Sequence, residues 1–509
     1  MAAQTAQEAV VIQRPGVVAA VPSRVGRNIA FLAGGQVVTW GLSLLWTVFV
    51  PRALGPHGIG ELTVAYAITG LVSVVVSLGI GTLMVKEIAR DHGRAPSLVG
   101  TALLIRVGFV APSLLAVGLY VYLGHFHGEQ ALVIWIATAT MVLALFTGPF
   151  QAAFQAIERM EYLAYADVLS KAVVTVLSIG LVLVGFGVVA VMVLAFVTTG
   201  VIMILNAYWS RSSFGVDWRL DRRQVRFLVV ESLPYWTTGL VLTAYMWIDS
   251  VMLSVMSTDV VVGWYAVPTK LFSTLLFLPV ILATAWLPRL SAAFRDGADA
   301  LRRTGRPALE LVLVVGLPIA IGTALVAKPL IRDLYGPAFA PSVTVLVLLA
   351  FTLPPTYFNI VVNQILVASN RQIAWTKVMV AASISNPILN LFLIRYFQAH
   401  QHNGAVGAAI SLLVTEIGMA LAGLVLLPPL LDSRSAIRLL RAVVATLGMA
   451  IVVWLVASHF GLLLQVASGA GTFAVLVLLL RVLSAEELEM VNAVLGRVGA
   501  KLKRQVGRS

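Results

Sequence analysis

The stretch VVAVMVLAFVTTGVIMILNAYW, residues 188–209, decides the fold class of this chain. It contains no Asp, Glu, Lys or Arg, and a membrane-spanning helix needs about 20 mostly apolar residues. Thirteen further segments have the same character, and they cover approximately 29–50, 61–85, 98–123, 131–156, 163–185, 228–256, 264–288, 307–327, 343–368, 373–396, 405–428, 442–459 and 462–483. The sequence therefore predicts an all-α polytopic membrane protein with about 14 transmembrane helices.

Composition supports this class and removes others. Hydrophobic residues make up 60% of the 509 residues and charged residues 11%, whereas soluble domains carry roughly 45–50% and about 25%. The chain has no cysteine, and its seven histidines show no metal-ligand spacing. We therefore expect no disulfide, no thiolate chemistry and no metal site.

The distribution of basic residues orients the predicted spans. Of the 35 Lys and Arg residues, 29 fall on one side if the chain begins in the cytoplasm, 4 fall on the other side, and 2 lie within spans. Because cytoplasmic loops carry the excess of Lys and Arg, both termini are predicted to be cytoplasmic and the number of spans to be even. This asymmetry also explains the net charge of +13 without a nucleic-acid partner.

The spans repeat. HGIGELTVAYA after the first span matches VVVGWYAVPTK after the seventh, with Gly60 aligned to Gly263 at an offset of 203. IERMEYLAYADV matches ASNRQIAWTKVM at an offset of 212, and GVVAVMVLAFVT matches GAVGAAISLLVT at 217. Six spans per repeat is an even number, so the two halves enter the membrane from the same side. The pattern predicts two parallel-repeat six-helix lobes around a central cavity, followed by two extra helices.

This repeat divides the chain into six predicted parts. They are a cytoplasmic tail (1–28), an N-lobe (29–210), a basic cytoplasmic linker (211–227), a C-lobe (228–428), two extra spans (429–483) and a basic C-terminal tail (484–509). In the last part, Leu488, Val491, Val494, Leu495 and Val498 fall on one helical face. We expect an interfacial helix on the anionic inner leaflet there, with a partly ordered tail as the alternative.

Several polar turns between the spans resemble those of a known family. They include RALGPHGIGELTVAYAI, LGIGTLMVKEIAR, FQAIERMEYLAYADVLSK, ESLPYWTTGLVLTAYMWIDSVMLSVMSTDVVVGWYAVPTKL, AKPLIRDLYGPAFAPS, SNRQIA and NGAVGAAISLLVTE. Over residues 28–430 the chain resembles bacterial oligosaccharide flippases of the Wzx type. These belong to the superfamily of multidrug/oligosaccharidyl-lipid/polysaccharide (MOP) exporters, which also contains lipid II flippases and multidrug antiporters.

The resemblance implies a fold and a function. It implies two lobes in a V shape, whose central cavity opens alternately to the two sides of the bacterial inner membrane. The implied substrate is an undecaprenyl-pyrophosphate-linked oligosaccharide, moved from the cytoplasmic to the outer leaflet for polysaccharide export. Membrane lipids and the polysaccharide polymerase or glycosyltransferase machinery are the implied partners.

Charged residues inside the spans are the first site candidates, because a charge in the bilayer is costly and usually faces a cavity or a partner. Lys270 in YAVPTKLFST is expected to bind pyrophosphate or an acidic sugar, and Asp249 in YMWIDSVMLS to tune Lys270 or carry a proton or sodium ion. Alternatively, these two form a structural ion pair. Arg106 and Arg52 are further candidates for the anion cavity, unless Arg106 snorkels to the inner interface and Arg52 caps the first span.

Uncharged polar residues and one glutamate mark the later spans. They are Asn359, Asn363, Gln364, Asn386, Asn390 and Glu416. Asn386 and Asn390 share a helical face through their i, i+4 spacing. Asn363 with Gln364 and Asn386 with Asn390 either form hydrogen bonds between the tenth and eleventh spans or line the path of the sugar, as Asn359 is also expected to do. Glu416 either lines this path or is a solvated or locally paired carboxylate.

Other functions fit the sequence less well. A lipid II flippase would use the same fold and stays an alternative. A cation-coupled multidrug exporter would also use this fold, but the first three spans hold no mid-membrane carboxylate to carry a coupling ion. A membrane-embedded glycosyltransferase is disfavoured because the outer loops are short and no DxD motif occurs. No Walker A motif occurs either. We therefore expect a transporter without catalytic residues or cofactors, with H⁺ or Na⁺ coupling left open.

Overall fold

The structure is a computed structural model that describes residues 24–427, 430, 432–457, 460–483 and 487. Most of the predicted tails (1–28 and 484–509), including the expected interfacial helix, therefore lies outside the described residues. Within the described ranges the chain is helical and contains no strand. The helices are α1 (Arg24–Ser77), α2 (Ile80–Arg90), η1 (His92–Arg94), α3 (Ala95–Leu123), α4 (Gly128–Ala156), α5 (Met160–Leu183), α6 (Val188–Ser213), α7 (Arg222–Met256), α8 (Asp259–Leu275), α9 (Phe277–Arg295), α10 (Ala298–Tyr335), η2 (Pro337–Phe339), α11 (Ser342–Ala368), α12 (Gln372–Gln401), α13 (Gly404–Leu426), α14 (Ser433–Ala457) and α15 (Leu462–Leu479).

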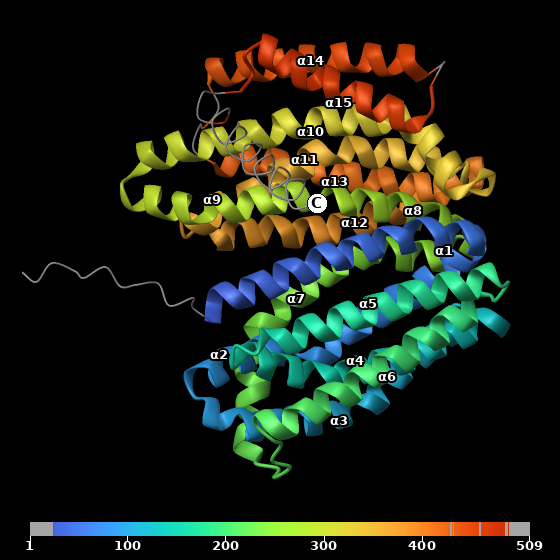
Figure 1. The fold of residues 1–509 in the computed structure, drawn as a ribbon, viewed down its shortest axis with the longest axis vertical. Helices are drawn as coiled ribbons and strands as arrows, with labels where there is room; N and C mark the ends of the chain where they lie inside the picture. Colours follow the sequence, from blue (N-terminus) through green and yellow to red (C-terminus); the bar gives the residue numbers. More distant parts are fainter. Residues whose placement is uncertain (1–23, 428–429, 431, 458–459, 484–486, 488–509) are drawn as a thin grey trace, which may run out of the picture.

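The number of membrane crossings agrees with the sequence. Thirteen helices of the described part are long and apolar enough to cross a membrane. One of them, α1, has 54 residues, which as a straight helix would extend about 80 Å, far beyond a hydrocarbon core of about 30 Å. Gly55 interrupts it with φ 70°, and Figure 1 shows α1 turning back on itself. Because α1 supplies two crossings, the described residues account for fourteen crossings, the number predicted.

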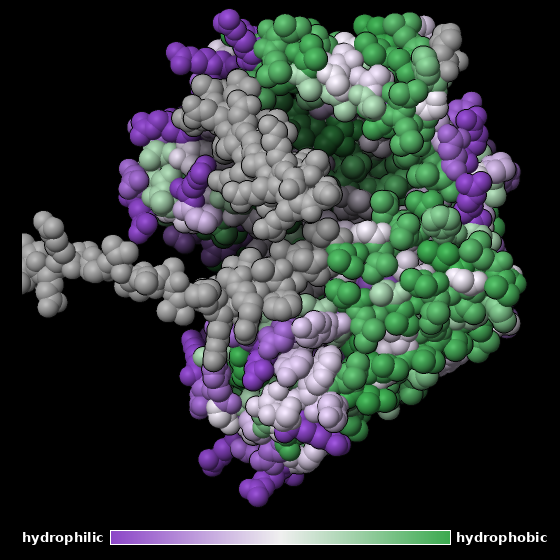
Figure 2. Space-filling view, viewed as in Figure 1, coloured by the Kyte–Doolittle hydropathy of each residue, from purple (hydrophilic) through white to green (hydrophobic). Residues whose placement is uncertain are grey.

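The helices lie side by side in two groups with a flanking pair (Figure 1). Helices α2–α6 occupy one half, α9–α13 the other, and α14 and α15 pack outside α10. We call the end where α1 begins the inner end, because it is predicted to be cytoplasmic, and the end where α1 turns at Gly55 the outer end. Figure 2 shows apolar side chains over the middle of the visible face and hydrophilic ones toward both ends, as a membrane protein requires.

The second helix of each predicted lobe is broken. In the C-lobe, α8 ends at Leu275 and α9 begins at Phe277. Pro279 has no N–H to donate to the carbonyl of Leu275, four residues earlier. The buried Tyr357 hydroxyl of α11 donates to that carbonyl instead, at 2.7 Å.

In the N-lobe the break lies between α1 and α2, where Leu78 and Gly79 both have positive φ. Two carbonyls freed there receive donors from other helices: Val76 from Arg106 of α3 at 3.0 Å, and Val74 from the Trp236 indole of α7 at 3.1 Å. Both breaks therefore leave no unsatisfied carbonyl at these positions, which would be expensive inside a bilayer.

Candidate transport cleft

A pocket lies where α1 meets α7 and α8. It has a volume of about 390 Å³ and is lined from both lobes. We call it the cleft pocket, and its lining residues are Trp46, Thr47, Pro51, Ile59, Leu62, Thr63, Tyr66, Met246, Trp247, Ser250, Ala266, Val267, Thr269, Lys270 and Ser273. Three aromatic rings, five hydroxyl-bearing Ser and Thr side chains and one lysine thus face a largely apolar cavity, which is the usual composition of a small-ligand site.

The internal repeat runs through this pocket. At the offset of 203, Thr47 of α1 corresponds to Ser250 of α7, and Tyr66 corresponds to Thr269 of α8; all four line the pocket. The counterpart of Lys270 is Ala67, which does not line it. The pocket therefore lies between equivalent segments of the two lobes, and the charged residue that lines it, Lys270, belongs to the C-lobe.

Lys270 is the one charged side chain among the described residues that line the cleft pocket. Its side chain is exposed. Lys171 of α5 lies close enough for its charge to act on Lys270. Lys171 was one of the 29 basic residues that the sequence count placed on the cytoplasmic side, but it lies three turns into α5 and so belongs with the residues inside the spans. Two lysines, one from each lobe, thus make this region attractive to an anion.

Asp249 does not pair with Lys270; it belongs to a separate buried group inside the C-lobe. Its carboxylate accepts a hydrogen bond from the Tyr265 hydroxyl at 2.8 Å and one from the Asn390 amide at 2.6 Å. Asn390 also donates to the Asn386 carbonyl oxygen at 3.1 Å. We call Asp249, Tyr265, Asn386 and Asn390 the Asp249 cluster; all four are at most 5% exposed.

Two amide atoms of the Asp249 cluster are left without a partner in the described part of the chain. They are the side-chain oxygen of Asn390 and the side-chain nitrogen of Asn386, and both are buried. A buried polar atom without a hydrogen bond costs roughly 1–3 kcal/mol. The cluster therefore combines a buried carboxylate with a free oxygen beside it.

Glu416 forms a second buried group in the same lobe. Its carboxylate accepts from the Tyr245 hydroxyl at 2.6 Å and from the Asn359 amide at 2.7 Å. Tyr245 lies one turn before Asp249 on α7, so one helix links the two carboxylates. Asn359 thus bonds to another helix of the C-lobe and does not line the cleft pocket.

The remaining polar candidates lie elsewhere. Asn363 and Gln364 are half-buried on α11 and do not line the cleft pocket. The expected hydrogen bonds between the tenth and eleventh spans, which are α11 and α12, are not formed by these residues in the described structure. Asn386 and Asn390 bond to each other, as their spacing predicts, but the second helix they join is α7.

The two candidate arginines have structural contacts outside the cleft pocket. Arg106 is buried, donates to the Val76 carbonyl at the break in the N-lobe and does not line the cleft pocket. Arg52 donates to the backbone carbonyl of Asp333 in α10 at 2.8 Å. It caps a helix of the opposite lobe rather than its own, and so helps to close the outer end.

Two glycines form the tightest contact between the lobes. A Cβ on Gly60 of α1 would lie 1.9 Å from the Asp259 carbonyl oxygen, and a Cβ on Gly263 of α8 would lie 1.9 Å from the Pro56 carbonyl oxygen. Both the two glycines and the two carbonyl residues are separated by 203 positions. The contact is therefore reciprocal, as between two copies of one motif, and it closes the outer end above the cleft pocket.

Sequence reasoning missed the aromatic lining of the pocket and the position of Lys171. Trp46, Tyr66 and Trp247 sit in apolar runs where aromatic residues are ordinary. For Lys171, counting the helical turns between the start of the span at residue 163 and the lysine would have placed it away from the membrane surface.

Two sequence comparisons relate the chain to known proteins. Residues 25–294 match the family model described as polysaccharide biosynthesis protein. The probable flippase AglR of Haloferax volcanii is 23% identical over 407 residues, which cover 77% of this chain and 81% of that protein.

Solved structures share the fold at low sequence identity. The lipid II flippase MurJ in an inward closed conformation gives a TM-score of 0.71 at 12% identity, covering 89% of this chain and 99% of that one. An inward-facing multidrug resistance transporter of the MATE family gives 0.62 at 17% identity, covering 79% and 94%. Solved flippase and MATE-family structures thus share the fold of this chain, and because the family match extends over more than half of its residues, the chain belongs to the polysaccharide biosynthesis protein family.

Proposed function

We propose that this protein is a flippase that moves an undecaprenyl-pyrophosphate-linked oligosaccharide from the cytoplasmic to the outer leaflet of a bacterial inner membrane. Both termini are cytoplasmic in this proposal, the lobes alternate access to the cleft pocket, and the chain performs no catalysis. The supporting observation is a pocket between the lobes that joins Lys270 to three aromatic rings. The likeness to a probable flippase points the same way.

The chemistry of the pocket suits the head of such a substrate. A pyrophosphate carries negative charge, and Lys270 with Lys171 nearby offers positive charge from two lobes. The hydroxyls of Thr47, Thr63 and Ser250 supply short hydrogen-bonding groups. A cationic drug would be repelled by the same lysines, and this favours the lipid-linked sugar over a multidrug substrate.

Replacing Lys270 tests the proposal. In proteoliposomes, Lys270→Met should raise the concentration of lipid-linked oligosaccharide needed for half-maximal flipping by roughly 10- to 100-fold, because a hydrogen bond to a charged group is worth about 1.5–3 kcal/mol. Lys328→Met is the matched control, since Lys328 is an exposed lysine of α10 away from the pocket. Equal flipping by both variants would remove Lys270 from substrate binding.

The same assay separates the related functions. Lipid II and a lipophilic cationic dye are offered in place of the lipid-linked oligosaccharide, each with wild-type protein. Faster flipping of lipid II would reassign the protein to peptidoglycan synthesis, and transport of the dye alone would make it a drug exporter.

We further propose that the Asp249 cluster carries the coupling ion, H⁺ or Na⁺. Na⁺ prefers hard oxygen ligands, and the cluster offers the Asp249 carboxylate beside the unpartnered oxygen of Asn390. A proton would serve equally, because it removes the cost of a buried charge. The cluster touches α7, α8 and α12, so occupancy can change how these helices pack.

A further inference from the structure

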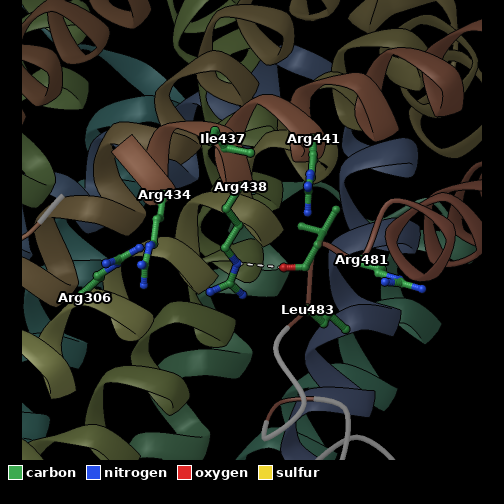
Figure 3. A pocket seen from close by; sticks show the side chains of 8 residues that line it. Arg306, Arg434, Ile437, Arg438, Arg441, Arg481 and Leu483 are labelled. Carbon is green, nitrogen blue, oxygen red and sulfur yellow. Dashed lines mark hydrogen bonds between the residues drawn. The ribbon is translucent and has the colours of Figure 1, made fainter. Parts of the chain in front are cut away.

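A second pocket lies at the inner end, away from the cleft pocket. It has a volume of about 350 Å³ and is formed by the beginning of α10, the beginning of α14 and the segment that follows α15 (Figure 3). Five arginines line it: Arg306, Arg434, Arg438, Arg441 and Arg481. We call it the arginine pocket. It involves the two helices that lie outside the repeated lobes.

The sequence of α14 creates most of this concentration of charge. Arg434, Arg438 and Arg441 follow an i, i+4, i+7 pattern, which places them on one face of a helix. Figure 3 shows their side chains extending the same way from α14, with Arg306 of α10 beside Arg434. Like charges at this spacing repel each other, so the arrangement requires compensation.

Carboxylates compensate two of the five arginines. Glu310 receives hydrogen bonds from Arg306 at 2.7 Å and from Arg438 at 2.7 Å. Asp432 and Glu487 each contact one of the same two arginines at 2.5 Å. The backbone N–H of Ser435 and the nearby Arg306 hold the pKa of Asp432 below its usual range, so Asp432 is ionised at neutral pH.

The other three arginines remain without a carboxylate. Arg434, Arg441 and Arg481 make no ion pair within the described ranges, and all three are exposed. Among the described residues, five guanidinium groups thus face three carboxylates, which leaves two surplus positive charges in this part of the arginine pocket. Guanidinium groups match the geometry of phosphate oxygens.

The rim of the pocket is apolar on the side of α14. Ile437 and Leu483 line the pocket, and Ile437 is 52% exposed. Leu440 and Val444 continue along α14 and are 63% and 50% exposed. In a membrane protein such side chains face acyl chains, so the pocket lies at the boundary between the inner surface and the hydrocarbon core.

We propose that the arginine pocket binds the phosphate of an anionic phospholipid of the inner leaflet, with the acyl chains along the apolar face of α14. Basic pockets between membrane helices on the cytoplasmic side are suited to such head groups. A free phosphate would gain nothing from Ile437, Leu440 and Val444. The bound lipid would tie α14 to α10 and leave the cleft pocket free.

Lipid binding by the purified full-length protein tests this proposal. Native mass spectrometry would measure phosphatidylglycerol bound to wild-type protein and to the triple variant Arg434→Gln, Arg441→Gln, Arg481→Gln. The control triple, Arg222→Gln, Arg223→Gln, Arg226→Gln, removes the same charge from exposed arginines at the beginning of α7. The first variant should weaken binding by about tenfold or more, and the control by less than about twofold.

Three results would overturn the proposal. They are equal loss in both triple variants, equal retention of phosphatidylcholine and phosphatidylglycerol by the wild type, and displacement of the bound lipid by millimolar inorganic pyrophosphate. If the triple variant cannot be purified, Arg441→Gln alone is compared with Arg222→Gln. Binding should then fall severalfold only for Arg441→Gln, and equal binding by the two single variants would also refute the site.

Discussion

The two lobes share a contact surface but differ inside. At the outer end, Gly60 and Gly263 make reciprocal contacts, as two copies of one motif would. In the interior, the C-lobe buries Asp249 and Glu416, each held by a tyrosine and an asparagine. At the offset of 203, the N-lobe counterpart of Asp249 is Trp46, which lines the cleft pocket.

This contrast separates two kinds of constraint. In a reciprocal contact, the same segment of each lobe packs against its counterpart in the other lobe. A change in one segment must therefore be matched by a change in the other. A buried carboxylate is costly, and one site per molecule suffices to couple an ion to transport. The two lobes therefore match at their contact, while the buried carboxylates Asp249 and Glu416 lie in the C-lobe and the N-lobe buries Arg106 with the Val76 carbonyl as its partner.

The largest expected effect comes from removing the charge that distinguishes the C-lobe. Asp249→Asn should abolish flipping while the protein still inserts, because a neutral amide cannot exchange a proton or hold a cation as a carboxylate does. Proteoliposomes with and without a sodium or proton gradient measure this. Asp299→Asn, an exposed carboxylate of α10, is the control and should flip at the wild-type rate. Gradient-dependent flipping by Asp249→Asn would refute the coupling role.

The second prediction attacks the shared contact. Gly60→Ala or Gly263→Ala places a methyl group against a backbone carbonyl of the other lobe, and overpacking of this kind costs about 1–3 kcal/mol. Each variant should shift the population away from the closed outer end by roughly 5- to 150-fold. The chain has no natural cysteine, so a single cysteine introduced into the cleft pocket as Thr63→Cys can be labelled selectively. The rate at which a thiol reagent added from outside labels it measures how often the outer end is open.

Two comparisons make this second test specific. Gly41→Ala is the control, because a Cβ there meets no atom within 4 Å. The double variant Gly60→Ala, Gly263→Ala should open the outer end little more than either single variant, since both changes act on one contact. Additive effects, or unchanged labelling of Thr63→Cys, would show that the reciprocal glycines do not control closure.

The fold could be predicted from the sequence because the patterns that indicate it, apolar runs and the distribution of basic residues, extend over whole segments of the chain. Apolar runs set the number of crossings, and the arginine distribution predicted their orientation, so errors of a few residues at span ends did no harm. The turn at Gly55 illustrates this: two spans were predicted there, and the helix is continuous around the bend except for one residue. The sequence analysis aligned Gly60 with Gly263 from the repeat offset alone. The structure shows that both glycines lie against a backbone carbonyl of the other lobe.

The site was predicted less completely because it depends on rotation about helix axes. Hydropathy locates Arg106 and Asp249 within their spans, but it does not say which neighbour each one faces. Arg106 meets the Val76 carbonyl of a broken helix, and Asp249 meets Tyr265 and Asn390. The spacing of Asn386 and Asn390 was informative because both lie on one helix, where 3.6 residues per turn fixes the face.

The smallest expected effect concerns the side chains that donate hydrogen bonds to the backbone carbonyls at the break in the second helix of each lobe. Tyr357→Phe removes the donor to the Leu275 carbonyl and should destabilise the protein by about 1–3 kcal/mol. In a Pro279→Ala background the new N–H can donate to that same carbonyl, so the penalty of Tyr357→Phe should shrink by about 1 kcal/mol. Reversible unfolding in mixed micelles measures both. Trp236→Phe removes one of the two side-chain donors to the Val74 carbonyl in the N-lobe, the other being the Ser77 hydroxyl, and its penalty should be the same in either background. Equal penalties for Tyr357→Phe would mean that Pro279 is not what frees the Leu275 carbonyl.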